Sequence, residues 1–312
     1  MDLFKLISEI EKVDPEVYDR FDSRRRVFKH FGTMGKAVTA ATLPALFSGL
    51  FTRAYGQTGT LPAEIAAVLN LALQLEYLEF YFYDTGLKSA NLIPAAERPG
   101  IEKIRNDESG HIKVLRGALG SQAFSQTDPP VTAFDYTGGG RFPDVFTNQA
   151  TYFGVAQGFV DTGVRAYKGG APVLMPNKDL LEAALNIHSV EARHSSHIRS
   201  IRRGSPGAMP DMNNLNQKPK SWISGTDNGG SAPPTTTPIY GPGTPATGGA
   251  TDIFFPAESN ITQAGVNIQT NTTGVAITVA GASESFDEPL DANTVKSIAR
   301  LFRAPGNTVL FA

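Results

Sequence analysis

Glu108-Ser109-Gly110-His111 and Glu191-Ala192-Arg193-His194 share one spacing, because in each tetrapeptide a glutamate precedes a histidine by three positions. In an α-helix, side chains three positions apart leave the same face. A carboxylate and an imidazole on one face can ligate the same transition-metal ion. The chain has 14 Glu and 5 His in 312 residues, so random placement gives only about 0.2 such spacings. The two tetrapeptides therefore predict a metal site built from two helices.

Apolar residues recur at helical spacing throughout the region that contains the two tetrapeptides. This periodicity predicts long helices, with Gly and Pro residues at their ends. We expect helices over residues 63–87, 95–119, 144–167 and 177–203, the third of them stopped by Gly169-Gly170 and Pro172. Four long helices with mostly short breaks favour an antiparallel four-helix bundle. The expected fold class is therefore mainly α.

The first of these helices reads Asn70-Leu-Ala-Leu-Gln-Leu-Glu76-Tyr-Leu-Glu79-Phe-Tyr-Phe-Tyr83. Together with the two tetrapeptides it resembles the ferritin-like carboxylate proteins, in which two helices each supply Glu-x-x-His and two others each supply a Glu to a two-metal centre. Residues 163–172, Gly-Val-Arg-Ala-Tyr-Lys-Gly-Gly-Ala-Pro, are similar to a bacterial branch of that superfamily that includes exported and desiccation-associated proteins. The resemblance covers about residues 61–203.

The resemblance implies a centre for iron or manganese in the middle of the bundle. Family members place the ligand Glu about two turns before a Tyr, which selects Glu76 over Glu79 because Tyr83 lies seven positions after Glu76. The implied metal ligands are Glu76, Glu108, His111, Glu191 and His194. No catalytic residue is assigned.

The third helix departs from the family pattern. In the bacterial branch a glutamate lies three residues before the glycine that corresponds to Gly163, and Val160 occupies that position here. Gln157 lies one turn earlier, and Asp161 is expected to face a different side of the helix. Three carboxylates at a site built for four would under-neutralise two divalent ions. Two interpretations therefore stay open: a single metal held by a subset of the ligands, or a metal-free site.

Each candidate metal ligand also has a structural role as an alternative to metal binding. The two Glu–His pairs can form a metal-free polar network, or can pair with Arg105, Arg193 or Arg165. We expect Glu79 on the surface or in contact with a ligand rather than as a ligand itself, and Tyr83 in bundle packing. His188 and His197 lie near the fourth-helix pair, and an outer role or solvent exposure is the expectation for both.

The N-terminal segment, residues 1–60, is treated separately from the bundle. Ser23-Arg-Arg-Arg-Val-Phe28-Lys29 followed by the apolar run 37–51 resembles a twin-arginine export signal, which implies a periplasmic or secreted protein. Lys36 and Pro44 interrupt the apolar run, and an amphipathic or buried helix in a cytoplasmic protein is the alternative. The run is too short for a membrane-spanning helix, which needs ~20 apolar residues.

The C-terminal third changes in composition. After the bundle, residues 61–205, comes a Gly/Pro/Thr-rich stretch, 206–262, that cannot bury enough apolar surface to fold alone. It is expected to be either a flexible linker or an extended strap over a neighbour. We name residues 206–262 the strap. The sequence of residues 263–312 predicts a small β add-on. It should contain a hairpin of strands 266–270 and 275–279, a short helix over 292–302 and a last strand over 308–311.

Composition limits the function. Net charge is −2 and Cys is absent, which argues against a nucleic-acid binder and excludes disulfides, thiolate metal sites and cysteine nucleophiles. The leading hypothesis is a ferritin-like metalloprotein that performs redox chemistry with O₂ or peroxide. The alternative is a structural or self-assembling protein on a degenerate, metal-free scaffold, in which the strap and the β add-on join copies into a homo-oligomer. An iron-storage shell is the weakest hypothesis.

Overall fold

The computed structural model describes residues 60–204, 219–225, 235–244, 255–270 and 276–312. The expected export segment, with its arginines at positions 24–26, lies outside the described residues, as do residues 205–218, 226–234 and 245–254 of the C-terminal third. Export and self-assembly therefore stay predictions.

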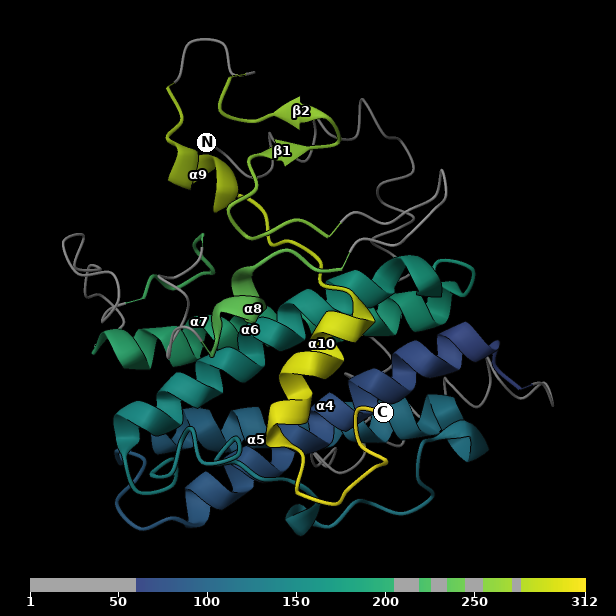
Figure 1. Cartoon of the computed structure of the whole chain (residues 1–312), viewed down its shortest axis with the longest axis vertical. Helices are drawn as coiled ribbons and strands as arrows, with labels where there is room; N and C mark the ends of the chain where they lie inside the picture. The colour runs from purple at the N-terminus through teal and green to yellow at the C-terminus, as the bar shows by residue number, and fades with distance from the viewer. Residues whose placement is uncertain (1–59, 205–218, 226–234, 245–254, 271–275) are drawn as a thin grey trace, which may run out of the picture. The chain divides into compact units, whose positions relative to one another are not determined.

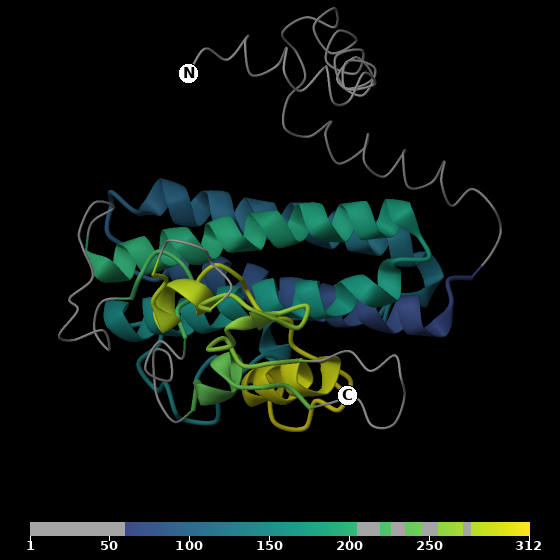
Figure 2. The ribbon, with the colours of Figure 1, turned by 90° about the horizontal axis from the view of Figure 1, so that it is seen from above.

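Four long helices form the main body, and they confirm the mainly helical prediction: α4 (Ala63–Lys88), α5 (Arg98–Leu119), α6 (Gln149–Leu174) and α7 (Lys178–Arg203). α4 packs along α5, α6 packs along α7, and the two pairs meet mainly through α4 and α6 (Figure 1). α4 and α6 are antiparallel, because Gly86 near the end of α4 lies against Tyr152 near the start of α6. Figure 2 shows the four helices running side by side.

Side chains at the helix ends explain where α6 and α7 begin and stop. The carboxamide of Asn148 accepts hydrogen bonds from the first backbone N–H groups of α6, and Asn177 does the same for α7. Both are N-caps that satisfy donors without a helical partner. Gly204 ends α7 with a φ of 95°, a left-handed conformation that glycine adopts without strain.

The predicted end of α6 at Tyr167 is wrong, because the helix continues through Gly169, Gly170 and Pro172 to Leu174. The two glycines serve close packing. A Cβ on Gly169 would collide with the carbonyl oxygen of Leu290, and a Cβ on Gly170 would press on Val68. Tertiary contact therefore outweighs the low helix propensity of glycine at this point.

Arg165 holds the C-terminal part of the chain against α6. Its side chain is fully buried and ion-pairs with Glu258 at 2.9 Å. The guanidinium also donates to backbone carbonyl groups from three separate segments: Ile239, Gly241, Pro256, Glu288 and Pro289. A guanidinium has five N–H donors and no acceptor, so one side chain satisfies many carbonyl groups that loops would otherwise bury unpaired.

The C-terminal elements differ in part from the prediction. The expected short helix is confirmed as α10 (Ala292–Ala299) with a 3₁₀ turn, Arg300–Phe302, and α10 contacts both α4 and α6. The hairpin is smaller and shifted, since β1 (Thr262–Gln263) pairs antiparallel with β2 (Val266–Asn267).

Two predicted C-terminal strands are wrong. Residues 276–278 are not a strand, Val279 begins the short helix α9 (Val279–Ser283), and residues 308–311 form turns. The side chain of Thr278 caps α9 by accepting from the N–H of Gly281. A second short helix, α8 (Thr237–Tyr240), lies in the strap and packs on α6.

α4 is long and apolar enough to cross a membrane by length and composition alone. However, 67% of its most apolar window is buried inside the structure, and the helix also buries Glu76 and Glu79. We interpret α4 as the core helix of the bundle.

Replacing Gly169 by Ala should destabilise the protein by about 1–3 kcal/mol, because the added methyl group has no space beside Leu290. Gly117→Ala is the matched control. Gly117 is exposed in α5 with no atom within 4 Å of an added Cβ, so alanine should stabilise that helix by about 0.5–1 kcal/mol. Urea unfolding measures both, and a neutral Gly169→Ala would contradict the close approach.

Replacing Arg165 by Met should release the C-terminal part from α6, because Glu258 and the carbonyl groups lose their donor. Breaking a buried ion pair costs about 3–5 kcal/mol. Limited proteolysis with mass spectrometry should show faster cleavage after residue 235. Arg105→Met, which removes a partly exposed pair with Asp84, should change stability by less than about 1 kcal/mol. Unchanged cleavage of Arg165→Met would show that other contacts hold the segment.

Candidate metal centre

Three helices bring six ionisable side chains into the middle of the bundle. α4 supplies Glu76 and Glu79, and α5 and α7 supply one Glu-x-x-His pair each. All six side chains are buried, with exposed fractions between 0% and 8%: Glu76, Glu79, Glu108, His111, Glu191 and His194. The structure therefore brings together all five residues expected from the sequence and adds Glu79.

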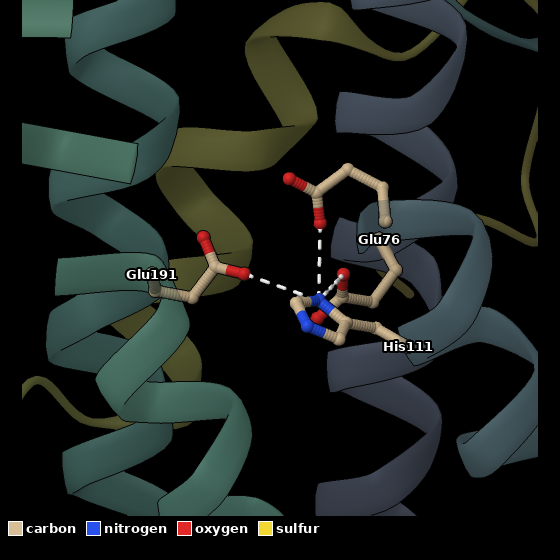
Figure 3. A group of neighbouring side chains, drawn as sticks. Glu76, His111 and Glu191 are labelled. Atoms are coloured by element: carbon tan, nitrogen blue, oxygen red, sulfur yellow. Dashed lines mark hydrogen bonds and ion pairs between the residues drawn. The ribbon is translucent and has the colours of Figure 1, made fainter. Parts of the chain in front are cut away.

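His111 stands at one end of this cluster. Its Nδ1 atom lies 3.0 Å from Glu76 Oε2, 3.2 Å from Glu108 Oε2 and 3.3 Å from Glu191 Oε1. Figure 3 shows the side chains of Glu76 and Glu191 pointing toward the ring from different helices. One ligand atom from each of these four residues lies within 4.8 Å of the others. A single N–H cannot satisfy three carboxylates, whereas one cation can.

His194 stands at the other end. Its Nδ1 atom lies 3.1 Å from Glu108 Oε1 and 3.5 Å from Glu191 Oε2, and its ring centre is 6.2 Å from that of His111. Its Nε2 atom lies 3.3 Å from Asp107 Oδ2. In the neutral imidazole, donation from Nε2 to Asp107 leaves the Nδ1 lone pair facing the cluster, which is how an outer carboxylate orients a metal-ligating histidine.

The charges of the cluster do not balance. In the described part of the chain, every ion pair of the four glutamates is with a histidine. Four carboxylates face two imidazoles, so two negative charges remain even when both rings are protonated. Burying an uncompensated charge is unfavourable by several kcal/mol, roughly, and bound divalent cations would reduce this penalty.

Burial and mutual repulsion shift the acidity of the cluster. Burial raises the pKa of Glu76 well above its ordinary value, although His111 opposes the shift. Burial also raises the pKa of Glu79, and the charges of Glu191 and Glu108 raise it further. For both histidines burial lowers the pKa, but the surrounding glutamates outweigh it and hold the pKa well above the ordinary value. These shifts favour the protonated forms of Glu76, Glu79 and both imidazoles.

Several ligand atoms of the cluster make no hydrogen bond to the described residues. These atoms are Glu79 Oε2, Glu108 Oε1, both carboxylate oxygens of Glu191, and His194 Nδ1. Buried polar atoms are almost always satisfied, so these atoms are available as donors to an ion. Carboxylate and imidazole donors suit iron, manganese or zinc, and the residues present therefore fit a transition metal.

α6 contributes no carboxylate to the cluster. Val160 is fully buried. Asp161 faces away, where Arg199 ion-pairs with it and Ser195 and Tyr240 donate to it. Gln157 donates to Tyr240 and accepts from Arg202. The expectation that neither residue replaces the missing glutamate agrees with these contacts.

Two expectations from the sequence need correction. Glu79 is not at the surface, since only 5% of it is exposed. Of the arginines considered as partners of the Glu–His pairs, Arg165 turns to the C-terminal part instead and Arg105 pairs with Asp84. The Glu76/Glu79 spacing of three matches that of the Glu-x-x-His pairs and was the available signal for an inward Glu79.

Two further residues of the site carried no signal of their own. Asp107 is placed beside His194 by its position before Glu108 on α5. Tyr167 lies on α6 and its hydroxyl donates to Glu76 Oε1, so it orients that carboxylate. His188 and His197 are only partly buried, and neither ion-pairs with the four glutamates in the described structure.

Comparison with protein families identifies a domain that spans the bundle. Residues 65–203 match the family model of the ferritin-like domain, which spans the four long helices. No curated protein and no solved structure matches the chain. Residues 65–203 of the chain are therefore a ferritin-like domain.

Proposed function

We propose that this protein binds iron or manganese in the centre of its bundle and uses the metal for redox chemistry with O₂ or peroxide. Four buried ligand atoms within 4.8 Å of one another, from Glu76, Glu108, His111 and Glu191, carry the proposal. His194 adds a second imidazole on the far side of Glu108 and Glu191. When bound, the metal would supply the electrons and an open coordination position for the oxidant.

The chain's own residues would bind and orient the metal. Glu76 is fixed by the hydroxyl of Tyr167, and His194 by the carboxylate of Asp107. Such outer contacts hold ligands in place and tune their basicity. The deep burial of the cluster excludes bulk water and strengthens every charge interaction within it.

A metal-free structural role is the competing function. The Glu–His contacts of 3.0–3.5 Å form without a metal, and α6 lacks the family's glutamate at Val160. In that case the bundle would be a scaffold for self-assembly. Strap residues 235–244 and 255–262 include carbonyl groups that bind Arg165 of the same chain. Metal analysis separates the two functions.

Protein prepared without chelator and loaded anaerobically with Fe(II), or with Mn(II), should retain at least about one metal per chain by elemental analysis. The double variant His111→Ala, His194→Ala should retain none, because each half of the cluster loses its imidazole. His188→Ala, on the same helix as His194 but outside the cluster, should bind like the wild type. Absence of metal in the wild type would support the structural alternative.

Metal binding should strengthen as pH rises and should release protons. The pKa values of His111 and His194 lie above the ordinary value, so both rings carry protons at neutral pH that the metal must displace. Lowering the pH adds competing protons, also on Glu76, whose pKa is raised. Calorimetric titration in two buffers of different ionisation enthalpy counts the released protons. Affinity that is independent of pH would contradict the assignment of these ligands.

A further inference from the structure

α4 and α6 face each other across the cluster with matching spacings. Tyr83 follows Glu76 by seven positions on α4, and Tyr167 follows Val160 by seven positions on α6. The hydroxyl of Tyr167 donates to Glu76 on the opposite, antiparallel helix. By the same geometry, Tyr83 would donate to a carboxylate at position 160, which is valine. Its hydroxyl is fully buried and makes no hydrogen bond within the described residues.

Glu79 lies where it can fill this gap. It follows Glu76 by three positions, and the equivalent residue on α6 is Gly163. A Cβ on Gly163 would lie 3.4 Å from both Glu79 Oε1 and Glu191 Oε2, so both carboxylates reach the surface of α6. Because Gly163 has no side chain, the carboxylate of Glu79 has room there. Glu79 Oε2 is buried without a hydrogen bond.

The cluster has two halves, one at His111 and one at His194. Glu108 and Glu191 each direct one carboxylate oxygen toward each of these histidines. Glu108 Oε2 faces His111 and Oε1 faces His194. Glu191 Oε1 faces His111 and Oε2 faces His194. Both carboxylates are therefore placed to bridge two ions, with Glu76 as the further carboxylate on the His111 side. The His194 side lacks such a carboxylate unless Glu79 provides it.

We propose that Glu79 replaces the missing α6 carboxylate and completes a second metal position with Glu108, Glu191 and His194. The proposal rests on the proposed function, since it requires the first metal position at Glu76 and His111. With Glu79 included, four carboxylates balance two divalent cations. Glu76 and Glu79, both from α4, would then each serve one metal position, while α6 supplies no ligand but leaves space at Gly163 and orients Glu76 through Tyr167.

The test is a Mn(II) titration of the full chain, with elemental analysis after desalting and electron paramagnetic resonance to detect a spin-coupled pair. The wild type should bind about two Mn(II) ions per chain, as a two-metal centre does, and show the coupled signal. Glu79→Gln, nearly isosteric, should bind about one and lose the coupling. Glu64→Gln, an exposed change on the same helix, should bind like the wild type.

A rescue variant separates ligation from a structural effect. Glu79→Gln combined with Val160→Glu should regain the second ion, because the carboxylate returns from α6. Anomalous scattering from Mn(II)-loaded wild-type crystals should place the second ion against Glu79, which tests the idea even where a variant does not fold.

The outcomes distinguish this proposal from the function on which it rests. Two ions in Glu79→Gln, or one ion in the wild type, would overturn the role of Glu79 and leave metal binding intact. A wild type that binds no ion would overturn the proposed function, and this inference with it.

Discussion

Uncompensated negative charge in the middle of a helical bundle is the constraint on which this structure depends. Four glutamates and two histidines lie buried among α4, α5 and α7, and within the described structure the glutamates ion-pair only with the two histidines. A bundle core normally gains stability from apolar burial, so a cluster of this kind opposes folding unless a cation or protons neutralise it. The raised pKa values of Glu76 and Glu79 are the direct consequence.

α6 serves the site and the C-terminal part from different faces. Toward the cluster it presents Val160 and Gly163, which leave the ligands to the other three helices. On another face, Arg165 forms an ion pair with Glu258 and its carbonyl oxygen accepts a hydrogen bond from the N–H of Leu290. Gly169 lets the backbone of Leu290 pack directly on the helix. The same helix thus positions the candidate centre and anchors the added segment, so a change at Arg165 can disturb the bundle as well as its attachment.

The helices were predictable because their signals are local. Apolar spacing and the caps at Asn148, Asn177 and Gly204 lie within a few residues of the boundaries that they set. The end of α6 was not predictable, because a long-range contact decides it: Gly169 stays helical where Leu290 packs on it. The predicted strand at residues 275–279 was wrong for a local reason, since Thr278 caps α9 and Val279 begins that helix.

The sequence by itself placed each Glu-x-x-His pair on one helical face, because a spacing of three does so whatever surrounds the helix, and the resemblance to the family selected Glu76. The same spacing of three places Glu79 on the face of Glu76, but only the tertiary structure decided that Gly163 leaves room for the Glu79 carboxylate, that Asp107 and Tyr167 orient ligands, and that Arg165 turns away from the site. The direction of these side chains depends on the volume and charge offered by a neighbouring helix, here the space at Gly163 and the carbonyl groups of the C-terminal part. No spacing within one helix contains that information.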